Sequence, residues 1–241
     1  YEYQKLMRII VPVYASITKF HQWGVIAIGV FTTVALASLP FAYQGVSLTT
    51  YATYIVIAVA VIILLAELVS KKINFKALMV SAVGIVYISM GLSLIFPLRA
   101  IMSNSFIGDI GYTIPLILII TIWVNDTAAY LVGSLIGRRP LSSISPNKTW
   151  EGTIAGILIS VLLVTKIMGQ YIPLNERSIL LISMVAAVAG TFGDLVESKL
   201  KRLAGVKDSG TMMPGHGGFL DRFDSILLAT PFVWLLIQLV Y

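Results

Sequence analysis

The chain has 241 residues, of which 58% are hydrophobic and only 12% are charged, whereas a soluble domain carries about 25% charged residues. This composition excludes an ordinary water-soluble fold, and it excludes disorder, which requires low hydrophobicity and high net charge. The chain has no cysteine, which excludes disulfides, thiol nucleophiles and cysteine-ligated zinc. The net charge of +6, on so apolar a chain, indicates a basic membrane face rather than nucleic-acid binding.

Seven apolar runs are long enough to cross a bilayer as helices, for which about 20 residues are needed. In chain order they cover residues 25–43, 51–68, 77–98, 114–136, 153–168, 178–195 and 225–240. A weaker eighth run, 8–18, is short and contains Pro12. The sequence therefore predicts an all-α, polytopic integral membrane protein with seven to eight transmembrane helices. Residues 1–20 receive no assigned role.

Lysine and arginine gather in three loops that alternate with loops of low charge. The basic residues are Lys71, Lys72 and Lys76, then Arg138, Arg139 and Lys148, then Lys199, Lys201, Arg202, Lys207 and Arg222. Seven spans place all three loops on one side of the membrane. Because basic loops stay in the cytoplasm, that side is predicted to be cytoplasmic.

Two aspartates lie at membrane depth. Asp126 interrupts the run 114–136, and Asp194 closes the run 178–195. An ionised side chain at the centre of a transmembrane helix costs at least about 2.5–3.5 kcal/mol, so such residues mark functional sites by default. The alternative is a carboxylate that merely pairs with a nearby lysine or arginine.

The third basic loop carries the densest polar signal. A helix is expected to begin near Phe219, which places Asp221 and Asp224 on one face of its first turn. A divalent cation would relieve the repulsion between these carboxylates, and oxygen ligands suit Mg²⁺. Acidic capping of the helix N-terminus is the alternative. His216, between glycines, is either a phosphate ligand or general acid, or a structural histidine.

The second basic loop, residues 137–152, adds hydroxyl, cationic and aromatic side chains, among them Ser145 and Lys148. Such a loop can simply meet anionic lipid headgroups, but it holds more special residues than that role requires. The small-residue pairs Gly133/Gly137 and Gly152/Gly156 predict close helix packing.

Residues 198–224 closely resemble the signature of phosphatidate cytidylyltransferases, also called CDP-diacylglycerol synthases. The matching pattern is Ser-x-Leu-Lys-Arg-x₄-Lys-Asp-x-Gly-x₃-Pro-Gly-His-Gly-Gly-x-x-Asp-Arg-x-Asp. Segments 126–130, 145–152 and 193–194 also look like those of the family and come in the same order, so the resemblance covers about residue 123 to the end. Met213 and Phe223 are conservative departures from the pattern. On this basis the chain divides into N-terminal transmembrane helices, 1–112, and a catalytic transmembrane region with cytoplasmic loops, 113–241, within one structural unit.

The resemblance implies the reaction CTP + phosphatidic acid → CDP-diacylglycerol + pyrophosphate, at the cytoplasmic face, with Mg²⁺ and with a second metal ion left open. It implies metal ligation by Asp194, Asp221 and Asp224, with Asp126 as a weaker candidate. Asp221, Asp224, Lys207 and Arg222 are the expected catalytic residues. The expected substrate- and phosphate-binding residues are Ser145, Lys148, Lys201, Arg202, Lys207, Asp208, His216, Gly217 and Gly218.

Other functions remain open at this stage. A related CTP-dependent lipid enzyme, either a CDP-archaeol-type synthase or a polyprenol kinase, would use similar chemistry, because the lipid tails leave no readable mark on the sequence. An ion-coupled transporter could use the intramembrane aspartates, but its polar groups should surround a midplane cavity. Membrane lipids are expected partners and nucleic acid is not; a homodimer is left open.

Overall fold

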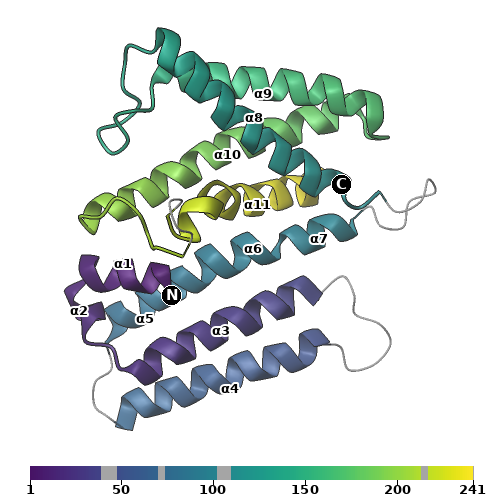
Figure 1. Ribbon diagram of the computed structural model, residues 1–241. Coiled ribbons are helices and arrows are strands. Elements are labelled where there is room, and N and C mark those ends of the chain that lie inside the picture. Colours follow the sequence, from purple (N-terminus) through teal and green to yellow (C-terminus); the bar gives the residue numbers. More distant parts are fainter. Residues whose placement is uncertain (39–47, 70–73, 102–109, 213–216, 241) are drawn as a thin grey trace.

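The computed structural model describes residues 1–38, 48–69, 74–101, 110–212 and 217–240. Long helices run back and forth across the molecule side by side (Figure 1). The elements are α1 Glu2–Ile10, α2 Pro12–Ala15, α3 Lys19–Ser38, α4 Leu48–Val69, α5 Phe75–Ile85, the π-helix η2 Val86–Met90, α6 Gly91–Ser93, α7 Ile95–Ala100, α8 Thr113–Ile136, α9 Trp150–Tyr171, α10 Glu176–Leu203 and α11 Leu220–Val240. An isolated antiparallel β-bridge pairs Pro140 with Thr149.

Seven helical segments of the described chain are long and apolar enough to cross a membrane, which confirms the all-α membrane fold. They cover Lys19–Ser38, Leu48–Ala66, Phe75–Ala100, Thr113–Ile136, Trp150–Tyr171, Glu176–Leu203 and Leu220–Val240. The weak eighth span was wrong: residues 8–18 belong to the end of α1 and to α2. The chain breaks at Val11, whose backbone is extended, and Pro12 then starts α2 at the first helical position.

The helices pack in antiparallel neighbours, with α8 against α9, α10 against α11, and α3 against α4. The largest buried cluster lies among α8, α10 and α11 and includes Ile117, Leu118, Ile182 and Val233. These helices therefore form one packed unit, at the end of which the polar loops converge.

Residues 1–20, which the sequence left without a role, are part of the core. Tyr3, Leu6 and Met7 of α1 are buried in a second cluster together with Leu220 of α11. The hydroxyl of Tyr3 donates to the carbonyl of Val80 in α5 (3.1 Å). The helix α1 thus fastens α5 to the start of α11.

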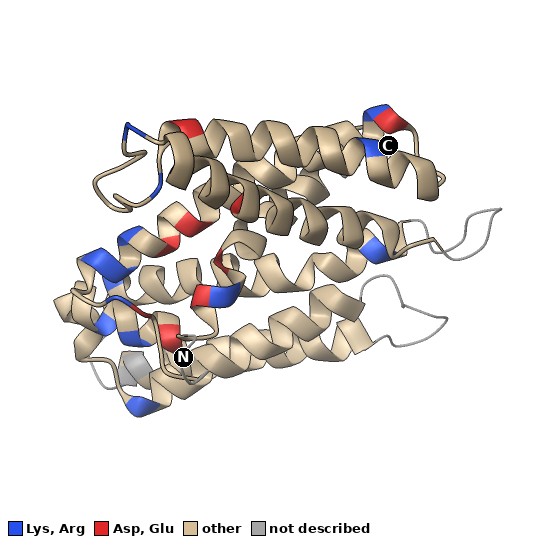
Figure 2. Ribbon diagram, turned by 45° about the horizontal axis from the view of Figure 1, so that its top comes forward, with Lys and Arg blue, Asp and Glu red and all other residues tan. Residues whose placement is uncertain are grey.

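The loop 137–149 and the described loop residues 204–212 lie at one end of the bundle, on the left in Figure 2. The basic end of α10 contacts the first loop directly, because Arg202 Nε donates to the carbonyl of Ile144 (3.3 Å). The two loops thus lie at the same end of the helices, and the side of the membrane that they occupy stays a prediction. Lys71 and Lys72 of the remaining basic loop lie outside the described residues.

Candidate functional site

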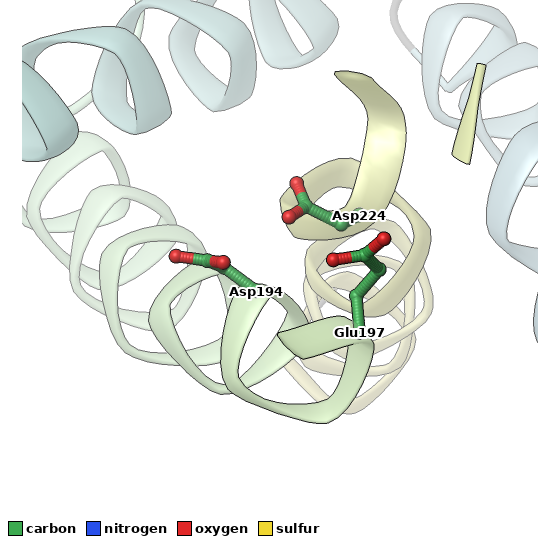
Figure 3. Close-up of side chains that lie close together, drawn as sticks. All are labelled: Asp194, Glu197 and Asp224. Carbon is green, nitrogen blue, oxygen red and sulfur yellow. The ribbon is translucent and has the colours of Figure 1, made fainter. Parts of the chain in front are cut away.

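Three carboxylates meet where α10 and α11 cross near the basic loops. Asp194 and Glu197 come from α10 and Asp224 from α11, and one oxygen of each lies within 4.8 Å of the others. Figure 3 shows the three side chains turned toward one common space. Of the three carboxylates expected to share a metal, Asp194 and Asp224 lie together, whereas the third member of this cluster is Glu197 rather than Asp221.

Glu197 was missed in the sequence analysis. The apolar run ends at 195, so 197 was assigned to a loop, whereas α10 continues to Leu203. Residues three apart on a helix share a face, which brings Glu197 beside Asp194. The i,i+3 spacing from Asp194 and the i,i+4 spacing to Lys201 were the signals that could have found it.

The close approach of α11 to α10 depends on Gly193. A Cβ atom at this position would lie 2.5 Å from the backbone oxygen of Asp224 and 3.1 Å from Cα of Ser225. Two main chains this close leave no room for a side chain between them. Gly193 therefore brings the neighbouring Asp194 within reach of Asp224.

Lys201 joins two carboxylates beside the cluster. Its Nζ lies 2.5 Å from Oε2 of Glu197 and 2.7 Å from Oδ1 of Asp221. Glu197 is fully buried, and its carboxylate has no backbone or hydroxyl donor among the described residues. A buried carboxylate without such donors needs cationic partners, because desolvating a charge is costly. Lys201 supplies one, and a further cation in the cluster would fit.

Asp221 is engaged mainly by the loop that precedes α11. Its Oδ2 accepts from the backbone N–H and the hydroxyl of Ser209, both at 2.9 Å, and from the N–H of Gly218 at 2.7 Å. Together with Lys201, four donors point at this one carboxylate. Metal ligation by Asp221 stays a prediction, while its present contacts show that it organises the loop.

Lys148 reaches the acidic cluster from the second loop and forms an ion pair with Asp194. Two backbone hydrogen bonds close the loop behind it, from Leu141 N to Lys148 O (2.6 Å) and from Trp150 N to Arg139 O (2.9 Å). Burial lowers the pKa of Lys148, while the nearby carboxylates, Asp126 among them, act in the opposite direction. The loop thus presents a cation to the carboxylates.

Asn125 and Asp126 of α8 form the opposite wall. The amide nitrogen of buried Asn125 donates to Asp126 Oδ1 and to Thr191 Oγ1, both at 3.3 Å. Its buried Oδ1 accepts no hydrogen bond from the described residues. A buried polar atom left in this state is an expected contact point for a ligand or water.

These groups line a cleft of about 560 Å³. Of the predicted site residues, it brings together Asp126, Ser145, Lys148, Asp194, Asp221 and Asp224. Five predicted residues do not line the cleft among the described residues, namely Lys201, Arg202, Lys207, Asp208 and Arg222. Lys201 instead pairs with Glu197 and Asp221 beside it, and Lys207 and Asp208 are exposed on the loop. Gly217 and Gly218 lead into α11, and His216 lies outside the described residues.

The donor set of the acidic cluster fits a hard divalent cation. All three candidate ligands are carboxylate oxygens, which Mg²⁺ prefers, and they lie close enough together to share one ion.

The predicted close packing of the small residues is seen between α8 and α9, on the other wall of the cleft. A Cβ at Gly152 of α9 would lie 2.8 Å from Cα of Gly133 of α8, so the two backbones leave no room for a side chain.

Sequence comparisons find relatives of this chain that are named phosphatidate cytidylyltransferase. A phosphatidate cytidylyltransferase of Bacillus subtilis is 49% identical over 123 residues, which is 50% of this chain and 45% of that protein. A phosphatidate cytidylyltransferase of Staphylococcus epidermidis is 37% identical over 185 residues, covering 75% of this chain and 67% of that protein. Phosphatidate cytidylyltransferase 4, chloroplastic, of Arabidopsis thaliana is 45% identical over 120 residues, 49% of this chain and 30% of that protein.

The family match extends well beyond the segment that carries the signature. The sequence pattern of the cytidylyltransferase family matches residues 12–240, which includes the helices of the N-terminal half. The chain therefore belongs to the cytidylyltransferase family.

Proposed function

We propose that this protein transfers the cytidylyl group of CTP to phosphatidic acid and releases pyrophosphate, forming CDP-diacylglycerol for phospholipid synthesis. The observation that carries the proposal is the cleft at one end of an apolar helix bundle, where Asp194 and Asp224 lie with Lys148. Buried Glu197 and its partner Lys201 lie beside these carboxylates. Family membership and the printed names of the relatives support it.

The reaction joins two anions, and the cleft supplies what that requires. The lipid phosphate oxygen attacks the α-phosphorus of CTP, the bond to the β-phosphate oxygen breaks, and pyrophosphate leaves with the electron pair. We assign Mg²⁺ to Asp194, Glu197 and Asp224; when bound, it neutralises phosphate charge and aligns the triphosphate. Asp126 and Asp221 remain candidate ligands at the edge of the same cleft.

The lysines neutralise the remaining negative charge. Lys148, on a loop between helices, can exchange its ion pair with Asp194 for a substrate phosphate. Lys201 is held between Glu197 and Asp221 and fixes the direction of both carboxylates. Positioning and electrostatic stabilisation of this kind account for most catalysis in phosphoryl and nucleotidyl transfer. The hydroxyl of Ser145 on the cleft wall can donate to the same phosphates.

The cleft also suits a lipid acceptor. Its wall on α8 includes Ser134 and Tyr130, and the side chain of Tyr130 is 75% exposed. A headgroup can therefore enter from the side while its acyl chains lie along the apolar surfaces of α8 and α9.

Purified protein in phosphatidic acid vesicles, given labelled CTP and Mg²⁺, tests the activity. We expect labelled CDP-diacylglycerol and stoichiometric pyrophosphate, with no product when EDTA is present or when Asp224→Asn replaces the wild type. An ether-linked lipid phosphate serves as a competing acceptor for CTP labelled in the cytidine, and polyprenol as one for CTP labelled in the γ-phosphate, the group that a kinase transfers. Faster labelling of either one than of phosphatidic acid would overturn the assigned acceptor.

We propose that the cleft faces the cytoplasm, because the basic loop 137–149 lines it and the basic end of α10, followed by loop residues 204–212, lies beside that loop. Ser143 is exposed on the first of these loops, and the native chain has no cysteine to interfere with labelling. A membrane-impermeant maleimide should therefore label Ser143→Cys in inverted vesicles and leave it unlabelled in intact cells. Labelling in intact cells would reverse the orientation.

A further inference from the structure

Glu2 of α1 contacts the start of α11, although 218 positions separate it from Leu220. Its Oε1 accepts the N–H of Phe219 (3.0 Å), and its Oε2 accepts the N–H of Leu220 (2.8 Å). The first N–H groups of a helix have no partner inside the helix and are usually capped by a nearby side chain. Here the cap arrives from the other end of the chain, where α1 lies beside the loop into α11 (Figure 1).

The contact continues into the acidic cluster. The hydroxyl of Ser209 lies 3.1 Å from Oε2 of Glu2 and 2.9 Å from Oδ2 of Asp221. Its single hydrogen can go to only one of them at a time, while the N–H of Ser209 stays on Asp221. From Asp221 the polar chain passes through Lys201 to Glu197.

The loop has glycine at two positions that adjoin the Glu2 side chain. A Cβ at Gly210 would lie 2.8 Å from Cδ of Glu2, and one at Gly218 would lie 2.6 Å from Oε2. The Glu2 carboxylate therefore occupies a space formed by both ends of the loop. A surface glutamate that merely capped a helix would not require glycine on both sides.

We propose that Glu2 is a positioning residue, which fixes the loop and the first turn of α11 so that Asp221 and Asp224 face the cleft. The inference rests on the proposed function and assigns α1 a part in it. Glu2 contacts the loop and α11, and α11 carries Asp224, a proposed ligand of the metal that binds the CTP triphosphate. We therefore expect Glu2 to affect kcat/KM for CTP and to leave KM for phosphatidic acid, which enters beside α8, unchanged.

Glu2→Gln in the full-length protein removes the negative charge and one of the two acceptor oxygens. We expect kcat/KM for CTP to fall about 10- to 100-fold, since small displacements of catalytic groups have effects of this size, with KM for phosphatidic acid within twofold of wild type. Glu2→Asp keeps the charge and should recover part of the loss. Glu176→Gln is the matched control, because Glu176 is an exposed glutamate at the opposite end of α10.

A substrate-free measurement separates positioning from general destabilisation. Hydrogen exchange of peptides that cover 217–223 should accelerate in Glu2→Gln, while peptides of α8 and α9 keep wild-type rates. A purely structural role would instead lower the active fraction, reducing kcat with both KM values unchanged.

Equal kcat/KM for CTP in wild type and Glu2→Gln, or unchanged exchange at 217–223, would overturn the proposal. If the wild type makes no CDP-diacylglycerol, the proposed function fails instead, and the exchange data alone then decide whether Glu2 holds the loop.

Discussion

The helix pair α3 and α4 differs from the helices around the cleft in how much of its apolar surface is buried by other helices. In α3 and α4 only 6% and 11% of the most apolar window is buried, against 44% in α10. The outer helices present apolar side chains to their surroundings on most sides, whereas α8, α10 and α11 pack on one another and bring polar groups together at one end. The polar cleft thus forms among helices that pack against several others, and not along the exposed pair α3 and α4.

The contrast has a physical cause. A carboxylate at membrane depth must find cationic or hydrogen-bonding partners, and only a helix enclosed by others can provide them. Asp194 and Glu197 have such partners in Lys148 and Lys201. Among the described residues of the N-terminal half, Glu2 of α1 brings a carboxylate to this end of the molecule, where it accepts the N–H of Leu220.

The sharpest test of the comparison removes a carboxylate from the cluster. Asp224→Asn or Glu197→Gln should lower kcat/KM by at least about 100-fold, the size seen when preorganised electrostatic groups are lost. Both variants should also bind Mn²⁺ more weakly in a titration followed by electron paramagnetic resonance, and Glu176→Gln should match the wild type. Wild-type Mn²⁺ affinity in both variants would refute the metal assignment.

The closeness of α10 and α11 can be tested at Gly193. Gly193→Ala places a methyl group against the backbone of Asp224 and should force the helices apart, at a cost of about 1–3 kcal/mol in stability and a loss of most activity. Gly169→Ala in α9 is the control, because a Cβ at this position would lie 3.3 Å from Cγ of Glu176, which belongs to a flexible side chain that can move. Thermal unfolding and product formation measure the two effects, and full activity in Gly193→Ala would show that the approach is not needed.

A smaller effect is expected at Lys148. Lys148→Met removes the cation that pairs with Asp194 and should raise KM for CTP about 10-fold, close to the loss of one charge-assisted contact. Lys148→Arg keeps the charge, and its KM for CTP should lie between those of Lys148→Met and the wild type. Initial rates at varied CTP measure this, and an unchanged KM in Lys148→Met would remove it from the phosphate-binding residues.

The smallest effect on catalysis is expected at Ser81 in α5, away from the cleft. The hydroxyl of buried Ser81 lies 3.1 Å from the hydroxyl of Tyr14 and 2.9 Å from Nε2 of His21. Ser81→Ala removes this shared partner and should lower stability by about 1–3 kcal/mol, with kcat within twofold. A decrease in Tm at constant kcat is the expected result, and loss of kcat at wild-type Tm would place this network in the reaction.

Much of this protein is determined by local sequence. Apolar runs of membrane length predict the seven spans, because a bilayer requires internally satisfied backbone over its whole thickness. The signature at 198–224 indicates the family, and the spacing of its polar residues predicts the start of α11 within one residue. The cost of a lone carboxylate at the end of an apolar helix indicated only that Asp194 needs a partner, which a lysine can also supply; the resemblance to the family implied that it lies with Asp224.

The tertiary structure alone decided which carboxylates meet. Glu197 joined the cluster because α10 continues beyond its apolar run, and hydrophobicity carries no signal for a helix that leaves the membrane core. Asp221 faces Ser209 and Lys201, and Glu2 caps α11, through contacts between chain segments whose distance in space no spacing reveals. Such contacts depend on how closely two backbones approach, as at Gly193, and that is settled only when the helices pack.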